Sequence, residues 1–426
     1  MSLADRRGLR LFAFCALYVA QGIPWGFTAV TLPAYFAGHH LDTAVVGTAL
    51  SMTTLPYTFK IFWAPIVDAF PSKRFGRRRP WIIGAQLMMA LTIGAMIAIP
   101  DLTRDLKLLA WMIFVHTIFN SIQDLSTDAL AVDLLDEAER GRVNGFMYAS
   151  KYFGGILGGA GMSKLIAWYG MRPALAAQTA VLLAIMLIPL LCRERPPGAS
   201  NIDAMPTRVR ERFVRLWLDV AELMRSAGAK SAALGAVMML VSAIGMGLMV
   251  AVAPVLFTQQ LDWKYDDYAA MTGGLGLAAG CAGAMLGGIL ADKVGHRLLV
   301  AIATIALAAV WIGWAALTPY WHDHRLVYAL VVIEPALQSV VIASLFAVCM
   351  DLSWPKIGAT QFGIYMALSN VSTTFGFKLA GWIGDSMSFA HIYVLAAVLQ
   401  LALVAVLPFV DARAVRRALS ESSPAS

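Results

Sequence analysis

Acidic and polar side chains line one face of a single apolar segment, residues 107–135. They recur at spacings of three and four, which places them on one broad face of a helix; they are His116, Asn120, Gln123, Asp124, Thr127 and Asp128. If this segment crosses a membrane, each ionised carboxylate costs at least ~2.5 kcal/mol, so it must face a cavity or an opposite charge. The chemistry that this pattern would support is the uptake and release of a proton.

Lysines in other apolar segments could supply the opposite charge. They are Lys60, Lys151 and Lys378. A further acid, Glu334, precedes Pro335, which removes a helical hydrogen bond and frees a carbonyl, and Gln338 follows one turn later. Our candidates for a substrate and proton pathway are Lys60, Gln123, Asp124, Asp128, Lys151, Glu334, Gln338 and Lys378, with Gln21 and Asn370 as added polar contacts.

Two interpretations of Asp124 and Asp128 stay open. In the first, at least one of them carries a proton and couples transport to the proton gradient. In the second, both form fixed ion pairs with Lys60 and Lys151 that hold the first half together; Lys60 could instead bind a substrate anion. Glu334 and Lys378 could also pair, because both are expected in the outer halves of their segments. If one acid carries a proton, a spare positive charge remains, which favours a substrate bearing carboxylate or phosphate.

The chain shows no catalytic or metal-binding pattern. HxxEH, nucleophile-elbow and phosphate-loop motifs are absent, and the four cysteines (Cys15, Cys192, Cys281 and Cys349) form no CxxC pair. We therefore expect neither an enzyme nor a cofactor or metal. Without a phosphate-binding loop, an ion gradient rather than ATP must drive any uphill transport.

An acidic, glycine-bearing and basic turn occurs twice after an apolar segment. The first contains Asp68, Gly76, Arg77 and Arg78, and the second contains Asp292, Gly295 and Arg297. The two glycines lie 219 residues apart, and the pairs Asp133/Asp351 and Gly145/Gly363 each lie 218 apart. A fixed offset of half the chain indicates duplicated halves in parallel orientation. Asp133, Glu139 and Arg140 form a further charge cluster, and we expect all of these groups to gate the cytoplasmic side.

The composition places the chain in a membrane. Of its 426 residues, 59% are hydrophobic and 14% are charged, with a mean hydropathy of +0.69, whereas soluble domains carry roughly 25% charge. Each helical crossing needs about 20 apolar residues. Twelve segments qualify, near 11–37, 43–69, 80–99, 107–135, 142–167, 173–192, 231–258, 266–290, 298–318, 326–350, 359–384 and 390–410. The net charge of +7 follows from membrane topology, so no nucleic-acid partner is expected.

Basic residues fix the orientation. With the amino terminus in the cytoplasm, only five of the 33 Lys and Arg residues lie on the opposite side (Arg104, Lys107, Arg172, Lys264 and Arg325). This asymmetry predicts that both termini are cytoplasmic. We predict a six-helix bundle over 1–193, a cytoplasmic linker with an amphipathic helix over 194–230, a second bundle over 231–412 and a cytoplasmic tail over 413–426.

The ordered motifs resemble those of the major facilitator superfamily over essentially the whole chain. The first half is similar to the peptide–acetyl-coenzyme A–drug branch, which includes the AmpG-type muropeptide permeases and related siderophore importers. The matching stretches are Tyr18 with 22–24, 56–68, 76–79 with Trp81 and Gln86, 123–124 with Asp128 and Asp133, and 139–141. The resemblance implies an all-α fold of twelve transmembrane helices in two bundles related by a pseudo-twofold. It also implies proton-linked import of a bulky polar solute.

We therefore expect a monomeric transporter of the inner (cytoplasmic) membrane. It would import a muropeptide, siderophore or related conjugate by proton symport with alternating access, with the lipid bilayer as its surroundings. After Asp128 the chain reads Ala-Leu-Ala-Val, where muropeptide permeases tend to carry Trp and Lys, which favours the siderophore importers. The alternatives are a sugar or glycoside–cation symporter and a non-transporting sensor or scaffold on the same fold.

Overall fold

The computed structural model describes residues 2–69, 76–195, 229–353, 358–384 and 386–410, and the single positions 211, 214, 217, 218 and 221. Within these ranges, the side chains at 61, 64, 65, 68, 69, 137, 138, 140, 141, 229, 231, 292 and 358–360 are not described. Most of the predicted linker helix and all of the predicted tail lie outside the described residues.

The first half of the chain is built from helices throughout. Their bounds are α1 (Arg7–Gly26), the π-helical turn η1 (Phe27–Thr31), α2 (Leu32–Gly38), α3 (Thr43–Thr58), α4 (Lys60–Ala69), α5 (Arg79–Met96), α6 (Leu106–Leu134), α7 (Glu137–Ile156), the π-helical turn η2 (Leu157–Gly161), α8 (Met162–Tyr169) and α9 (Met171–Leu191). α1, η1 and α2 run on as one span, Arg7–Gly38.

The second half repeats this helical pattern. Its elements are α11 (Ala229–Val241), α12 (Ile244–Val255), η4 (Leu256–Gln260), α13 (Tyr265–Met271), η5 (Thr272–Gly276), α14 (Leu277–Val294), α15 (His296–Ala316), η6 (Thr318–Tyr320), α16 (His324–Leu352), α17 (Gly358–Ile383), α18 (Phe389–Val406) and η7 (Leu407–Phe409).

The helices confirm the predicted all-α membrane fold. Eight segments among the described residues are long and apolar enough to cross a membrane. The four other predicted segments, 43–69, 80–99, 142–167 and 359–384, are mainly helical as well. The pattern is consistent with twelve crossings.

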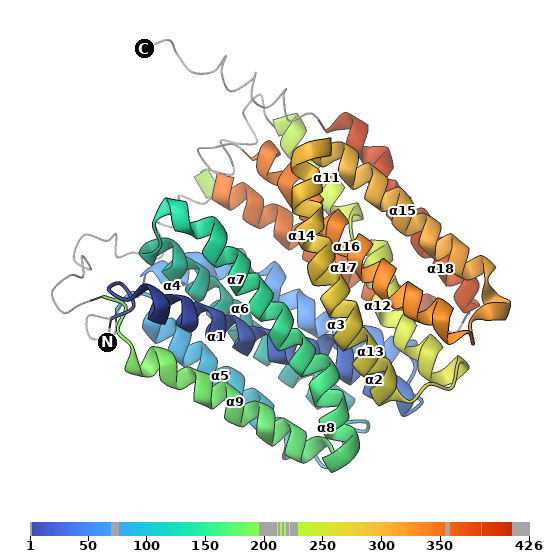
Figure 1. Cartoon of the computed structure of the whole chain (residues 1–426), viewed down its shortest axis with the longest axis horizontal. Coiled ribbons are helices and arrows are strands. Elements are labelled where there is room, and N and C mark those ends of the chain that lie inside the picture. Colours follow the sequence, from blue (N-terminus) through green and yellow to red (C-terminus); the bar gives the residue numbers. More distant parts are fainter. Residues whose placement is uncertain are drawn as a thin grey trace, which may run out of the picture. The chain divides into compact units, whose positions relative to one another are not determined.

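The chain forms two compact units (Figure 1). Unit 1 comprises Met1–Leu41, Leu55–Val209 and Asp262–Leu277, and unit 2 comprises Asp42–Thr54, Arg210–Leu261 and Ala278–Ser426. Each unit thus takes most of one half of the sequence and one short segment of the other. The bundle boundaries that we drew from the sequence remain a prediction.

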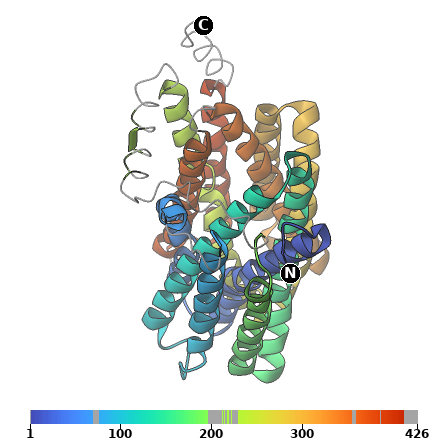
Figure 2. The ribbon, with the colours of Figure 1, turned by 90° about the vertical axis from the view of Figure 1, so that its left-hand side faces the viewer.

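Helix pairs organise each unit. In unit 1, α1 packs against α7, and α5 packs against both α6 and α9. Figure 2 shows α8 and α9 side by side, joined at Gly170, whose φ of +88° is a backbone conformation that favours glycine. In unit 2, α15 packs against α16 and α18, and α12 packs against α17.

Glycines allow α1 to approach α7 and η2 at backbone distance. A Cβ atom added at Gly158 would lie 1.9 Å from the carbonyl oxygen of Ile23, and one added at Gly26 would lie 2.1 Å from that of Gly155. The Thr31 hydroxyl donates to the carbonyls of Gly158 and Gly159 at 2.8 and 2.7 Å. In lipid, where hydrophobic association is weak, such close packing holds helices together.

Candidate substrate and ion pathway

A charged cluster joins three helices inside unit 1. The Lys60 Nζ atom on α4 lies 2.6 Å from Asp124 Oδ2 and 3.5 Å from Asp128 Oδ2, both on α6. The Lys151 Nζ atom on α7 lies 3.8 Å from Asp124 Oδ1. The structure therefore brings together four of the predicted pathway residues, with two positive and two negative charges.

Tyrosine side chains border this cluster. The Tyr18 hydroxyl of α1 hydrogen-bonds Asp128 Oδ1, so each oxygen of this carboxylate has a partner. The Tyr18 ring meets the ring of Tyr148 edge to face, with centroids 5.9 Å apart. One turn further along α7, the Tyr152 ring meets Trp25 at 6.1 Å in the same way. Lys151 therefore lies between two tyrosines of its own helix.

Buried amides connect α1, α5 and α6 beside the cluster. The Gln21 amide nitrogen donates to Gln123 Oε1 at 2.7 Å, and the Gln123 amide nitrogen lies 3.3 Å from Gln86 Oε1. Gln86 in turn donates to the Leu182 carbonyl on α9 at 3.1 Å. All three glutamines are fully buried, so hydrogen bonding to one another offsets much of their desolvation cost.

The acid of unit 2 has a different environment. Glu334 Oε1 accepts hydrogen bonds from Trp311 Nε1 at 2.9 Å and from Gln338 Nε2 at 3.1 Å. The pairing of Glu334 with Lys378 that the sequence allowed is not formed. Within the part of the chain that the structure describes, Lys378 and Asn370 make no side-chain hydrogen bond or ion pair, although the Asn370 carbonyl accepts from Thr374.

At the first turn motif, a glutamate that we did not predict binds the start of α5. Gly76 has a φ of +103°, and the Glu194 carboxylate accepts from the backbone N–H groups of Arg77, Arg78 and Arg79. The Arg77 and Arg78 bonds measure 3.0 and 2.7 Å. A carboxylate at a helix N-terminus satisfies free N–H groups and interacts favourably with the helix dipole.

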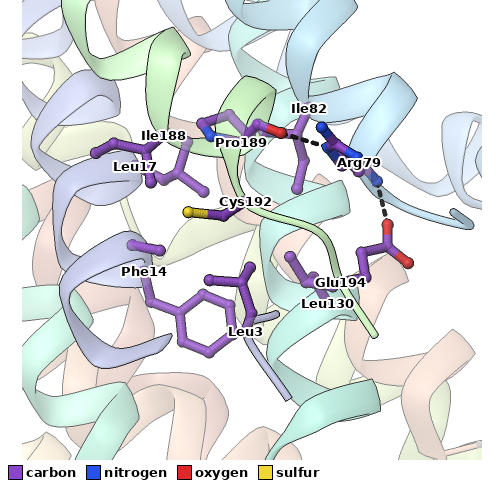
Figure 3. A pocket seen from close by; sticks show the side chains of 11 residues that line it. Leu3, Phe14, Leu17, Arg79, Ile82, Leu130, Ile188, Pro189, Cys192 and Glu194 are labelled. Carbon is purple, nitrogen blue, oxygen red and sulfur yellow. Dashed lines mark hydrogen bonds between the residues drawn. The ribbon is translucent and has the colours of Figure 1, made fainter. Parts of the chain in front are cut away.

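Two arginines at the start of α5 bind groups on α6 and α9. The Arg78 guanidinium lies 3.2 Å from Asp133 Oδ2. The Arg79 guanidinium donates to the Pro189 and Leu190 carbonyls at the end of α9, and Figure 3 shows Arg79 between Pro189 and Glu194. The cavity beside them is only ≈ 10 Å³. It is too small for a substrate, so this region is tightly packed and is not a substrate site.

The second half repeats these contacts at a constant offset. His296 Nδ1 lies 2.8 Å from Asp351 Oδ2, and both residues follow Arg78 and Asp133 by 218. The Arg297 guanidinium donates to the Leu407 carbonyl at 2.7 Å and to the Pro408 carbonyl at 3.3 Å, again 218 residues after Arg79 and its two carbonyls. Gly295 has a φ of +91°. The duplication is thus visible in side-chain contacts and not only in the sequence.

The remaining predicted gating residues divide into two groups. Glu139 pairs with Arg7 at 3.2 Å and with Arg10 at 3.0 Å, which ties α7 to the start of α1. The side chains of Asp68, Arg140 and Asp292 lie outside the described residues.

A helical membrane protein with duplicated halves and matched basic turns has the architecture of a secondary transporter. The sequence model of the Major Facilitator Superfamily matches residues 14–352 and 234–425. The chain belongs to this superfamily.

Two relatives extend over most of the chain. The anhydromuropeptide permease of Escherichia coli strain K12 is 26% identical over 376 residues, covering 88% of this chain and 74% of that protein. A Rickettsia conorii protein named "Putative transporter AmpG 4" is 23% identical over 403 residues, covering 91% of this chain and 94% of that protein. The resemblance to AmpG-type permeases that the motifs predicted is confirmed.

Solved structures of transporters share the fold. The D323A mutant of the nucleoside transporter NupG superposes with a TM-score of 0.73 at 13% identity, covering 94% of this chain and 100% of that one. The xylose transporter XylE of E. coli superposes with a TM-score of 0.70 at 12% identity, covering 94% and 96%. Together with the superfamily match and the relatives above, this fold identifies the protein as a multi-pass membrane transporter rather than an enzyme.

Proposed function

We propose that this transporter imports an anionic, bulky polar solute of the muropeptide class together with protons. The observation that carries the proposal is the lysine–aspartate cluster within unit 1, in a chain similar to an anhydromuropeptide permease over 88% of its length. Siderophores and related conjugates remain the second substrate class. We further propose that the protein works as a monomer in the inner membrane, with both termini in the cytoplasm.

Lys151 is the best candidate for binding a substrate anion. Asp124 has a closer partner in Lys60, at 2.6 Å, than in Lys151, at 3.8 Å. A carboxylate of the solute could therefore approach Lys151 without leaving Asp124 unpaired. The Tyr148, Tyr152 and Trp25 rings nearby offer faces on which a sugar ring could stack.

A binding measurement tests the substrate class. The purified full-length protein is heated with an anhydromuropeptide, a ferric siderophore or a neutral glycoside, and the unfolding midpoint is followed. A bound ligand stabilises the folded state, by about 2.7 kcal/mol at a hundredfold excess over Kd. We expect the anhydromuropeptide to raise the midpoint, and the neutral glycoside to leave it unchanged.

A matched pair of lysine variants tests the role of Lys151. Lys151→Gln should abolish the stabilisation by the anhydromuropeptide. Lys164→Gln serves as the control, because Lys164 pairs with Asp266 and Asp267 at 2.8 and 2.6 Å, away from the cluster. If the siderophore alone stabilises the protein, siderophores rather than muropeptides are the substrate class. Stabilisation by the glycoside alone would favour a sugar symporter, and no response to any solute would favour a sensor or scaffold.

A further inference from the structure

Glu334 is a membrane-embedded acid whose two oxygens differ. Both neutral N–H donors, from Trp311 on α15 and Gln338 on α16, reach Oε1, at 2.9 and 3.1 Å. Oε2 receives neither bond. Trp311 is fully buried, so the indole holds the carboxyl group in a fixed position while Oε2 stays available for another atom.

No positive charge among the described residues compensates Glu334 within ion-pair distance. The other titratable or charged groups on α16 and on the elements packed against it (α11, α14, α15 and α17) are Lys230, Cys281, Asp292, Lys293, His296, Arg297, His324, Arg325, Tyr328, Cys349, Asp351, Tyr365 and Lys378. Several are engaged elsewhere: His296 with Asp351, Arg297 with two carbonyls, and Tyr365 with Gln361.

The aspartates of unit 1 have the opposite environment. Lys60 and Lys151 balance Asp124 and Asp128 charge for charge. A proton added to either aspartate would leave this cluster with a net positive charge inside the membrane, which is costly. A proton added to Glu334 would instead remove an uncompensated charge. The two units therefore differ in charge: unit 1 contains balanced ion pairs, and unit 2 contains an acid that a proton can neutralise.

We propose that Glu334, rather than Asp124 or Asp128, binds and releases the coupling proton. This inference rests on the proposed proton-linked import. A proton from water would form an O–H bond at Oε2, while Trp311 and Gln338 keep their hydrogen bonds to Oε1. Release to water on the other side would break the same O–H bond and restore the carboxylate.

Infrared titration of the full-length protein in lipid nanodiscs tests the proposal without any substrate. A protonated carboxyl group absorbs apart from a carboxylate, so its C=O band reports the proton directly. We expect the wild-type protein to show such a band that disappears as pH rises. Glu334→Gln should remove it, while Asp124→Asn and Asp128→Asn should keep it. Trp311→Phe should move its midpoint, because one hydrogen bond to the carboxyl group is lost.

Several outcomes would overturn the proposal. These are persistence of the band in Glu334→Gln, its loss in Asp124→Asn or Asp128→Asn, and an unmoved midpoint in Trp311→Phe. If Glu334→Gln does not fold, Glu334→Asp decides instead: it keeps a carboxyl group, so the band should remain with a shifted midpoint, and an unshifted band would contradict the proposal.

Transport by the same variant separates this inference from the proposed function. In proteoliposomes, Glu334→Gln should lose accumulation of labelled anhydromuropeptide driven by a pH gradient by tenfold or more relative to the wild type, on the order of 1.4 kcal/mol. Gradient-driven accumulation equal to that of the wild type would refute the role of Glu334. If the wild-type protein moves no anhydromuropeptide, the proposed function fails, and the infrared titration still decides the proton site.

Discussion

At the scale of single residues, Lys60 has the largest structural role in the charged cluster. It lies within 4 Å of both Asp124 and Asp128, whereas Lys151 reaches only Asp124. A buried ion pair adds little net stability, but removal of one partner leaves an uncompensated charge. The cluster therefore constrains which substitutions the first half of the chain tolerates.

Lys60→Met tests this constraint. We expect a loss of about 3–5 kcal/mol of stability, seen as a lower unfolding midpoint in detergent and less protein in the membrane, because two aspartates would share one distant lysine. The double variant Lys60→Met/Asp124→Asn should recover much of the loss, since Lys151 and Asp128 then balance. A double variant no more stable than the single one would show that charge balance is not what Lys60 provides.

Glu194, which follows α9, makes an equally specific contribution. Its carboxylate binds three consecutive N–H groups at the start of α5. We expect Glu194→Gln to lower the free energy of unfolding by roughly 1–2 kcal/mol, because a carboxylate at a helix N-terminus is lost. Asp136→Asn is the matched control, because it removes a carboxylate at the N-terminus of α7 that is exposed and makes no capping hydrogen bond, so its shift should be clearly smaller. Equal shifts in both variants would contradict a capping role.

At the scale of elements, each of the duplicated halves makes the same arginine–carbonyl contact between two of its helices. An arginine at the start of α5 or of α15 binds the carbonyls at the end of the last helix of its half, at Pro189 and Leu190 or at Leu407 and Pro408. Free carbonyls end every helix, and a guanidinium can satisfy two of them. This contact joins the third and the sixth predicted spans of each half.

The packing of α1 against η2 gives a prediction at the same scale. Gly158→Ala would place a methyl group 1.9 Å from the Ile23 carbonyl oxygen. We expect a loss of about 1–3 kcal/mol, typical of overpacking, measured as a lower unfolding midpoint. Gly161→Ala is the matched control in the same turn, because its Cβ would meet nothing closer than 4.0 Å. A Gly161 variant as unstable as the Gly158 variant would point to loss of glycine itself and not to the helix contact.

At the scale of the whole molecule, the sequence was sufficient for the fold class. Apolar length, the position of basic residues and the offset of 218–219 predicted helices and duplication, because lipid forces backbone hydrogen bonds inside each span. Lys60, Asp124, Asp128 and Lys151 could also be grouped in advance, since buried charges need partners.

Other parts of the site could not be predicted. Trp311 as the donor to Glu334 depends on the rotation of α15 against α16, and an apolar segment does not encode that rotation by composition. Glu194 is the first residue of the predicted linker, where the sequence of an acid beside arginines looks the same as that of a solvated loop. The one available signal for His296 and Asp351 was the 218-residue offset, which we used for Asp351 and did not extend to position 296.

The central claim is proton-coupled import of an anionic solute. Accumulation of labelled anhydromuropeptide in proteoliposomes with a more acidic exterior tests it most directly. We predict that the solute reaches a higher concentration inside than outside, that a protonophore abolishes this gradient, and that Lys151→Gln reduces uptake while Lys164→Gln does not. Uptake that only equilibrates, or that is unchanged by the protonophore, would contradict the account.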